Sequence, residues 1–298
     1  MAKLIECVPN ISEGRRPEII EAVVNEVRRT PGVTLLDYSS DASHNRAVLT
    51  FLGNPEGVGE AAVAVAKKAA ELIDLTVHRG EHPRMGAVDV IPFIPIKDVT
   101  MEECVALSKE VAGRVWEEAH IPVFLYEESA LAPSRANLAA IRKGQFEGMA
   151  QKVLEPDWEP DFGGRTVHPT AGVAAVGARM PLIAFNINLS TSDVTVASNI
   201  AKLIRQSSGG LPYVKALGVM LSERNIAQVS INMTNFQKTP LYRVLELVKA
   251  EARRCGVSVI GTEIVGLAPM QALSDSAEYY MQIEAFDFHK QVLENHIL

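Results

Sequence analysis

Residues 227–234 read AQVSINMT and alternate strictly between apolar and polar side chains, which is the period of a half-buried β-strand. Residues 185–189, FNINL, alternate in the same way, with asparagine at the polar positions. One face of the sheet is therefore apolar and is expected to take the helices, whereas the other is rich in amides and hydroxyls. A solvated sheet face and the polar wall of a ligand cleft both fit this pattern.

The segments around these strands predict the order β-α-β-β-α-β for the second half of the chain. Its expected elements are a strand at 182–189, a helix at 193–206, strands at 214–221 and 226–234, a helix to about 254 and a strand at 257–265. The first half shows the same order before an extra helix and strand. Its expected elements are a strand at 4–8, a helix at 17–29, strands at 33–37 and 46–52, a helix at 56–73, a strand at 85–91, a helix that begins at a capping box of Thr100 and Glu103, and a strand at 123–127.

Two halves with one order of elements predict an α/β (α+β) fold built from two related split-βαβ subdomains. A chain of 298 residues also suits two subdomains of about 150 residues each. We place the subdomains at 1–178 and 179–298, and interpret the stretch 156–180, which contains glycine and proline, as the linker. If the polar sheet faces oppose each other with the helices outside, they enclose a ligand with many hydrogen-bonding groups.

Composition restricts the partners and the compartment. The net charge of −7 gives no electrostatic support for binding nucleic acid. The three cysteines are widely spaced and form no CxxC pair, which disfavours a disulfide framework and fits a reducing cytosol. The chain shows neither a signal peptide nor an apolar run of about 18 residues, so we expect a cytoplasmic protein without a membrane partner.

The densest group of chemically active side chains is HRGEHPRMGAVDVIP, residues 78–92. Glycine and proline oppose a regular helix there, so we expect His82 on a bent loop, as an acid/base group with a pKa near 7. Glu81, Arg84 and Asp89 are close enough in sequence to orient the ring or shift its pKa. A loop histidine that is hydrogen-bonded to backbone is the alternative interpretation.

HRGEH also matches the inverted zinc-peptidase motif H-x-x-E-H. That motif needs both histidines on one face of a continuous helix, and Gly80 and Pro83 argue against such a helix. We therefore expect no metal, and keep a zinc hydrolase that uses His78, Glu81 and His82 as a rival hypothesis.

Three loops carry the other candidates. SSDASHNR, residues 39–46, places Asp41, His44 and Arg46 at a tight turn, where turn chemistry alone also explains the aspartate. DFGGRTVHPTAG (161–172) and RQSSGGLPYVK (205–215) are glycine-bearing loops whose backbone amides can approach a ligand closely. Neither has a dinucleotide fingerprint or a P-loop lysine, so nucleotide binding is not indicated, and a flexible linker is the alternative for the first.

Several strings together resemble one known family: ECVPNISEGRR, LLDYSSDASHNR, HRGEHPRMGAVDVIPFIP, PDFGGRTVHPTAGVAAVGAR, LIAFNIN and IVGLAP, in that order. The chain is similar over essentially its whole length to the glutamate formimidoyltransferase family, also found as the formiminotransferase part of formiminotransferase-cyclodeaminase. The resemblance implies two α/β subdomains whose sheets flank a folate-binding tunnel, and a homodimer. It does not extend to a cyclodeaminase part, so a separate cyclodeaminase is a candidate partner.

The implied reaction transfers a formimidoyl group from N-formimidoyl-L-glutamate to tetrahydrofolate during histidine degradation. Tetrahydrofolate is then a co-substrate, and no metal is required. A formyl donor in place of the formimidoyl donor, or a folate-binding protein without catalysis, are the alternatives. The retained GEHPRMGA string argues against the second, because a binding module does not need the acid/base histidine.

The resemblance also assigns site residues. His82 is the catalytic acid/base, and we add Asp41 and Arg84 to the catalytic set. Asp41 is a candidate to replace an acid that many relatives carry where this chain has Ser39. Carboxylates of the substrates require cations, for which Arg46, Arg84 and Arg165 are the candidates. The implied folate-contacting residues are Gly163, Gly164, Arg165, Thr166, Val167, His168, Pro169, Thr170, Ala171 and Gly172, with Gly209, Gly210 and Lys215 in the second subdomain.

Overall fold

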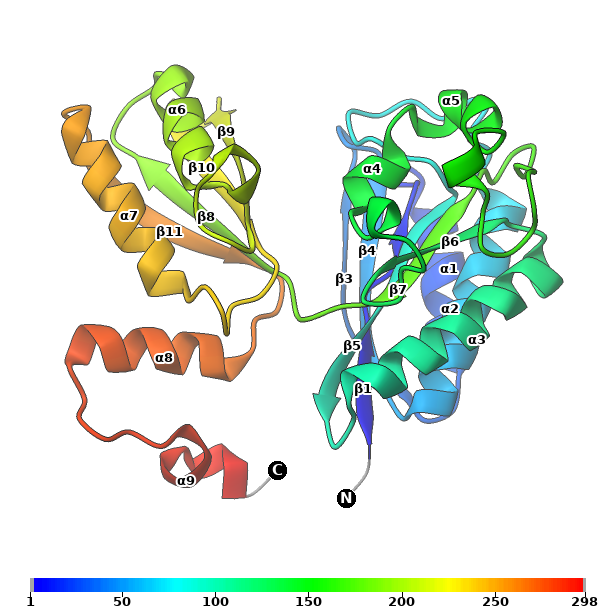
Figure 1. Cartoon of the computed structure of the whole chain (residues 1–298), viewed down its shortest axis with the longest axis horizontal. Helices are drawn as coiled ribbons and strands as arrows, with labels where there is room; N and C mark the ends of the chain where they lie inside the picture. The colour runs from blue at the N-terminus through cyan, green and yellow to red at the C-terminus, as the bar shows by residue number, and fades with distance from the viewer. Residues whose placement is uncertain (1–2, 297–298) are drawn as a thin grey trace. The chain divides into compact units, whose positions relative to one another are not determined.

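The computed structural model describes residues 3–296. The chain divides into two compact units, of which the first ends at Arg179 and the second begins at Met180. Each unit combines one β-sheet with several helices, so the predicted α/β (α+β) class is confirmed (Figure 1). No helix in the described part of the chain is both long and apolar enough to cross a membrane.

The first unit contains most of the secondary structure. Its elements are β1 (Leu4–Cys7), β2 (Asn10–Ile11), α1 (Pro17–Arg29), β3 (Val33–Asp41), β4 (Arg46–Gly53), α2 (Pro55–Leu72), β5 (Val88–Lys97), α3 (Met101–Ala119), β6 (Val123–Glu127), α4 (Leu138–Arg142), α5 (Gln145–Lys152) and β7 (Ala174–Ala178). Those of the second unit are β8 (Ile183–Leu189), α6 (Val194–Ile204), β9 (Val214–Leu221), β10 (Ile226–Met233), α7 (Leu241–Arg254), β11 (Val259–Val265), α8 (Met270–Met281) and α9 (Phe288–Gln291).

Both sheets contain the same split-βαβ arrangement. The strand order of the second unit is β11-β8-β10-β9, with antiparallel neighbours throughout. In the first unit β1 and β2 lie between β4 and β5, and β3 pairs with the outer edge of β4. Numbered along the chain, both units therefore have the strand order 4-1-3-2, as the repeated pattern of elements predicted.

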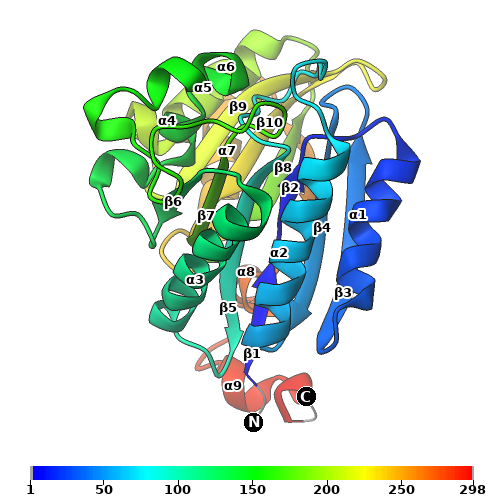
Figure 2. The same ribbon diagram turned by 90° about the vertical axis from the view of Figure 1, so that its right-hand side faces the viewer.

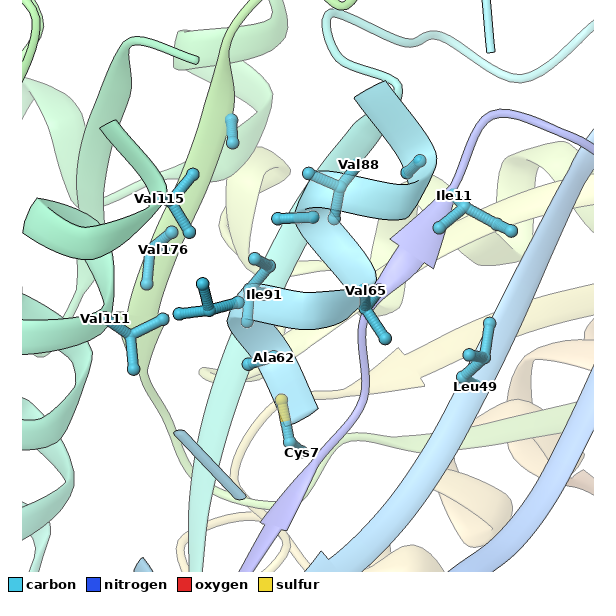
Figure 3. Close-up of a cluster of buried hydrophobic side chains, with 14 of the residues drawn as sticks. Cys7, Ile11, Leu49, Ala62, Val65, Val88, Ile91, Val111, Val115 and Val176 are labelled. Carbon is cyan, nitrogen blue, oxygen red and sulfur yellow. The ribbon is translucent and has the colours of Figure 1, made fainter. Parts of the chain in front are cut away.

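The apolar core of the first unit lies between its sheet and helices α1, α2 and α3. These helices lie side by side across one face of the sheet (Figure 2). Their inward stripes meet the strands in one buried cluster. Figure 3 labels members of this cluster from the helices and the strands: Ala62, Val65, Val111 and Val115 on α2 and α3, and Cys7, Ile11, Leu49, Val88, Ile91 and Val176 on or beside the sheet.

The opposite face of this sheet is covered only in part. Ile141 of α4 and Met149 of α5 pack against Phe124, Tyr126 and neighbouring residues of β5 and β7 in a separate buried cluster. The sequence reading did not predict these two short helices. They cover the β5–β7–β6 end of the face, so one end of α4 lies near the beginning of β5, where the candidate site is found.

The prediction of a linker at 156–180 was wrong for the second half of this stretch. Residues 174–178, AAVGA, form β7, which pairs in parallel with both β5 and β6, and all five residues are buried. Such small apolar residues are typical of a strand with both faces covered, but nearby glycines and prolines obscure the pattern. The strand expected at 85–91 begins later, at Val88, and extends to Lys97 through Pro92 and Pro95. A strand proline loses one donor but keeps its acceptor, and the backbone N–H of Val8 donates to Pro92.

The capping box at the start of α3 is confirmed, and it allows a test of stability. The hydroxyl of Thr100 accepts from the backbone N–H of Glu103, whose carboxylate accepts from the N–H of Thr100. We expect Thr100→Ala to lower the free energy of unfolding by about 1 kcal/mol, measured by urea denaturation. Thr195→Ala in α6 is the matched control, because its exposed side chain does not cap that helix. Equal effects in the two variants would contradict the capping role.

Candidate active site

His82 lies on an irregular loop between α2 and β5, as the sequence predicted. The loop is held against the turn between β3 and β4, because Glu81 donates its backbone N–H to Ser43 (3.2 Å) and His82 donates to His44 (3.4 Å). A Cβ atom on Gly80 would lie 2.3 Å from the carbonyl oxygen of His44. Only glycine therefore allows the loop and the turn to approach this closely.

Asn45 ties this turn to two other segments. Its backbone has a φ of 52°, a left-handed conformation that asparagine adopts more readily than most residues. Its side-chain oxygen accepts from the N–H of Gly14 (2.9 Å), and its amide nitrogen donates to the carbonyl of Arg79 (2.9 Å). The ring of His78 contacts the Asn45 carbonyl through Nε2 (2.9 Å). The buried asparagine thus fixes the His82 loop relative to the turn and to the segment after β2.

The ring of His82 is half-buried among cations. Its Nδ1 lies 3.4 Å from Nη1 of Arg46, and its Nε2 is buried without a hydrogen-bond partner in the described structure. The ring of His44 lies 6.5 Å away between centroids. Burial, followed by the charges of Arg46 and Arg142, lowers the pKa of His82 from 6.5 to about 3. The imidazole is therefore neutral at pH 7 in the unliganded protein.

The predicted pKa near 7 for His82 was wrong, and so was the choice of neighbours. We expected Glu81, Arg84 and Asp89 to orient the ring or shift its pKa. The contact to the ring comes instead from Arg46 on β4, which is far away in sequence. Burial and charges from distant segments have no short-range signature in the sequence, so the local motif could not reveal them.

The two guanidinium groups near His82 have different surroundings. Arg142, the last residue of α4, donates from Nε to Asp89 (2.7 Å) and forms a salt bridge with it. The second oxygen of Asp89 accepts from the N–H of Met85 (2.7 Å). Arg46 is half-buried, and no carboxylate of the described residues lies within salt-bridge distance of it. Burial, and then the charge of Arg142, lower the pKa of Arg46, and the charges of Asp41 and Asp89 only partly offset this effect, so the position is suited to an anion.

Asp41 contacts His44, whose ring centroid lies 6.5 Å from that of His82. One oxygen of Asp41 accepts from the backbone N–H of His44 (2.8 Å), and the other lies 2.9 Å from the His44 ring. The backbone N–H bond lowers the pKa of Asp41 most, so the carboxylate stays charged. The prediction that Asp41 belongs to the catalytic set remains open. The geometry gives it an indirect path to His82 through His44.

Arg84 is buried and its donors are occupied. Its Nη2 and Nη1 form a bidentate pair with Glu147 (2.6 and 2.8 Å), and its Nε donates to Nδ1 of His78 (3.2 Å). This pairing holds the pKa of the Glu147 carboxyl at about 2. Arg84 thus joins the His82 loop to α5, and its predicted contact with a substrate remains a prediction.

The geometry of His78 weakens the zinc-hydrolase hypothesis. Residues 78–82 are not helical, so the two histidines do not share a helix face. Both ring nitrogens of His78 already have partners, the Asn45 carbonyl and the Arg84 guanidinium. His78 therefore has a structural role in holding the loop.

The glycine-bearing segment 163–172 lies beside the His82 loop. Ala87 donates its backbone N–H to Ala171 (2.9 Å), and Gly172 forms a bridge with Gly86. The segment closes on itself, because Nδ1 of His168 accepts from the N–H of Ala171 (2.9 Å). The structure thus brings this predicted folate loop next to the start of β5.

The most exposed part of the segment 163–172 includes Gly164 and Arg165. Gly164 has a φ of 61° with open space around its Cα, and Arg165 is exposed and paired with Glu159 (3.1 Å). The remaining predicted residues of the loop are Gly163, Thr166, Val167, Pro169 and Thr170. These residues are half-buried or exposed, so this strip of the loop is partly accessible.

The last predicted folate residues lie in the second unit. Gly209 has a φ of 87° in the turn after α6, where most other residues are strained. A Cβ on Gly210 would lie 2.4 Å from the backbone of Ile204, so a close approach within the unit accounts for this glycine. Lys215 is exposed on β9. Their contact with folate remains a prediction.

Comparison with known proteins supports the resemblance over nearly the whole chain. Residues 4–179 match the family model described as the formiminotransferase domain, N-terminal subdomain, and residues 184–296 match the formiminotransferase domain. The chain belongs to the formiminotransferase family. It is 61% identical to a protein of Streptococcus pyogenes named glutamate formimidoyltransferase, over all of both chains. The chain is therefore an enzyme of the transferase class.

Two further relatives differ in how much of their own length matches this chain. A glutamate formimidoyltransferase of Thermoplasma acidophilum is 48% identical, over 95% of this chain and 94% of the relative. A formimidoyltransferase-cyclodeaminase of Mus musculus is 45% identical over 95% of this chain, which corresponds to 53% of the relative. The chain thus spans about half the length of that relative.

We expect His82→Gln to lose less stability on acidification than the wild type. The pKa of His82 is about 3 in the folded protein, against 6.5 for the ordinary side chain. The unfolded chain therefore binds more protons between these values, and the free energy of unfolding decreases as the pH falls from 6.5 toward 3. Above 6.5 this contribution is fully present. Glutamine does not titrate, so the variant lacks this part of the pH dependence.

Urea denaturation at about pH 7 and about pH 5 measures this difference. His289→Gln, which removes an exposed imidazole from α9, is the control and should keep the wild-type pH dependence. If the His82→Gln variant and the wild type lose the same stability between the two pH values, the ring is not held neutral by its surroundings.

Proposed function

We propose that this enzyme transfers a formimidoyl group from N-formimidoyl-L-glutamate to tetrahydrofolate, with His82 as the acid/base. The products are 5-formimidoyltetrahydrofolate and L-glutamate, and the reaction belongs to histidine degradation. The names of the full-length relatives support the reaction. The observation that carries the role of His82 is a neutral imidazole beside Arg46, a cation without a carboxylate partner among the described residues.

The chemistry requires one proton to move between two nitrogen atoms. The N5 nitrogen of tetrahydrofolate attacks the formimidoyl carbon and forms a tetrahedral adduct. N5 then gives up its proton, and the glutamate nitrogen gains one before its bond to carbon breaks. An imidazole that starts neutral can accept the first proton and donate it in the second step, which contributes about 10²–10⁴-fold to the rate. No proton is gained or lost overall.

The protein contributes mainly position and charge to the other steps. Binding both substrates side by side replaces a collision in solution with a reaction between neighbours. Arg46 is the best candidate for a donor carboxylate, because Arg84 is already paired with Glu147. The formimidoyl carbon is activated by its own protonatable imine, so the proposal includes no metal.

Tetrahydrofolate is the proposed co-substrate, and its contacts are assigned to the two glycine-bearing loops. Residues 163–172 are favoured because the loop lies beside the strand that follows His82. Gly209, Gly210 and Lys215 are proposed as contacts from the second unit. We further propose that residues 1–178 and 179–298 are the two subdomains, and that the protein is a cytoplasmic homodimer. A separate cyclodeaminase is the proposed consumer of the product.

The central experiment is a spectroscopic transfer assay with His82→Ala. We expect turnover to fall at least about a hundredfold, because the proton then has no acceptor in the site, while tetrahydrofolate still binds. N-formimidoyl- and N-formylglutamate are both offered as donors, so the assay also tests the formyl alternative. His289→Ala is the control. Turnover near the wild-type value in His82→Ala would reject this histidine as the acid/base.

A second experiment tests the exposed arginine of the folate loop. We expect Arg165→Ala to weaken tetrahydrofolate binding about tenfold, because a charge-assisted bond to a carboxylate of the folate tail is lost. The matched control is Glu159→Ala, which removes the carboxylate that Arg165 now contacts and should leave binding unchanged or tighter. Equilibrium binding followed by fluorescence distinguishes these results. Unchanged affinity in Arg165→Ala would remove this residue from the site.

A further inference from the structure

The contact between Arg46 and His82 occupies the nitrogen that should accept a proton. A guanidinium group can only donate hydrogen bonds, so Nδ1 of His82 presents its lone pair to Nη1 of Arg46 at 3.4 Å. The neutral ring must then carry its hydrogen on Nε2, which is buried without a partner among the described residues. The nitrogen that should act as the base therefore lies against a cation.

Arg46 differs from the other charged groups near the ring because it forms no salt bridge among the described residues, and the charges of Asp41 and Asp89 act on it only at longer range. Asp89 is paired with Arg142, Asp41 lies against His44, and Glu147 is paired with Arg84. In the described part of the chain no carboxylate lies within 4.0 Å of the Arg46 guanidinium, although the side chain is half-buried. An anionic ligand would therefore find the donors of Arg46 available.

We propose, on the basis of the function inferred above, that Arg46 couples binding of the donor's carboxylate to release of the Nδ1 lone pair of His82. A carboxylate accepts two parallel, charge-assisted hydrogen bonds from one guanidinium, and these are stronger than a 3.4 Å contact to a neutral nitrogen. The ligand draws the guanidinium away from Nδ1 and neutralises its charge. Nδ1 can then accept the proton that N5 of tetrahydrofolate gives up.

The charges around the ring favour this coupling. His82 is faced by Arg46 from β4, Arg142 from α4, His44 from the β3–β4 turn and His78 from its own loop. Burial lowers the pKa of the ring most, and the two guanidinium charges follow. Because Arg142 already has Asp89 as a partner, Arg46 is the charge that an arriving carboxylate changes. Arg46 is thus a positioning residue for the base in addition to a binding residue.

The test uses glutarate, a dicarboxylate without a group to transfer. The His82 ring is followed by NMR of protein labelled with ¹⁵N-histidine, in a pH titration with and without saturating glutarate. We expect the ring to stay neutral down to about pH 5 without glutarate, and its midpoint to rise by about one pH unit or more when glutarate is bound. Binding is verified by calorimetry, so this readout does not depend on turnover.

Variants at position 46 separate charge from geometry. In Arg46→Gln the midpoint of His82 should rise without glutarate and no longer respond to it. In Arg46→Lys a cation remains, so the midpoint should stay low without the ligand. Arg114→Gln is the matched control, because it removes one arginine charge from the outer helix α3 and should leave the wild-type response. Circular dichroism shows whether each variant is folded. If Arg46→Gln is unfolded, the titrations of the wild type and of Arg46→Lys test the coupling instead.

An unchanged His82 titration with glutarate bound would overturn the coupling, as would the wild-type response in Arg46→Gln. Failure of glutarate to bind would overturn it equally, because no carboxylate would then reach Arg46. These failures differ from failure of the proposed function. If His82→Ala keeps its turnover, the acid/base role is lost, whereas an essential His82 with an unresponsive titration rejects the coupling alone.

Discussion

One amide side chain, that of Asn45, joins the chain segments from which the candidate site is built. It bonds to Gly14 and Arg79, while the backbone carbonyl of Asn45 contacts the ring of His78. The hydrogen bonds with Gly14 and His78 are buried, and a buried polar group without its partner costs about 1–3 kcal/mol. The close approach at Gly80 adds a steric requirement to this network. The position of the His82 ring therefore depends on contacts between neighbouring segments that do not involve the ring itself.

Those parts of the structure that follow a regular period could be predicted from the sequence. The helix at 17–29 and the strand at 214–221 begin and end as expected, and the helix keeps an uninterrupted apolar spacing. The capping box of α3 was visible because its two residues are three positions apart. The bent loop around His82 followed from glycine and proline alone. In each case the information lies within about one turn or one strand of the residue concerned.

The site's electrostatics could not be predicted in this way. Arg142 reaches the neighbourhood of His82 only because α4 lies over the sheet, and α4 is too short to give a clear helical period. Arg46 was considered for its carboxylate chemistry, but its contact with the ring depends on how closely the loop and β4 approach. The charges of Arg46 and Arg142 lower the pKa of His82 together with burial of its ring, and no local sequence pattern indicates how deeply a loop residue is buried. The expected pKa of His82 was wrong for this reason, although the residue itself was singled out.

The place of β7 has a consequence for how the first unit folds. This strand lies between β5 and β6 but follows both in the chain, with Val90 opposite Ala175. Until residue 178 has been synthesised, β5 and β6 have no strand to join them, so the sheet of the first unit cannot be completed. Pairings between such distant segments form slowly, because a long loop must close first. Within the first unit, the last strand to be synthesised is thus the one that completes the sheet, so this sheet cannot be completed in the order in which its strands are made.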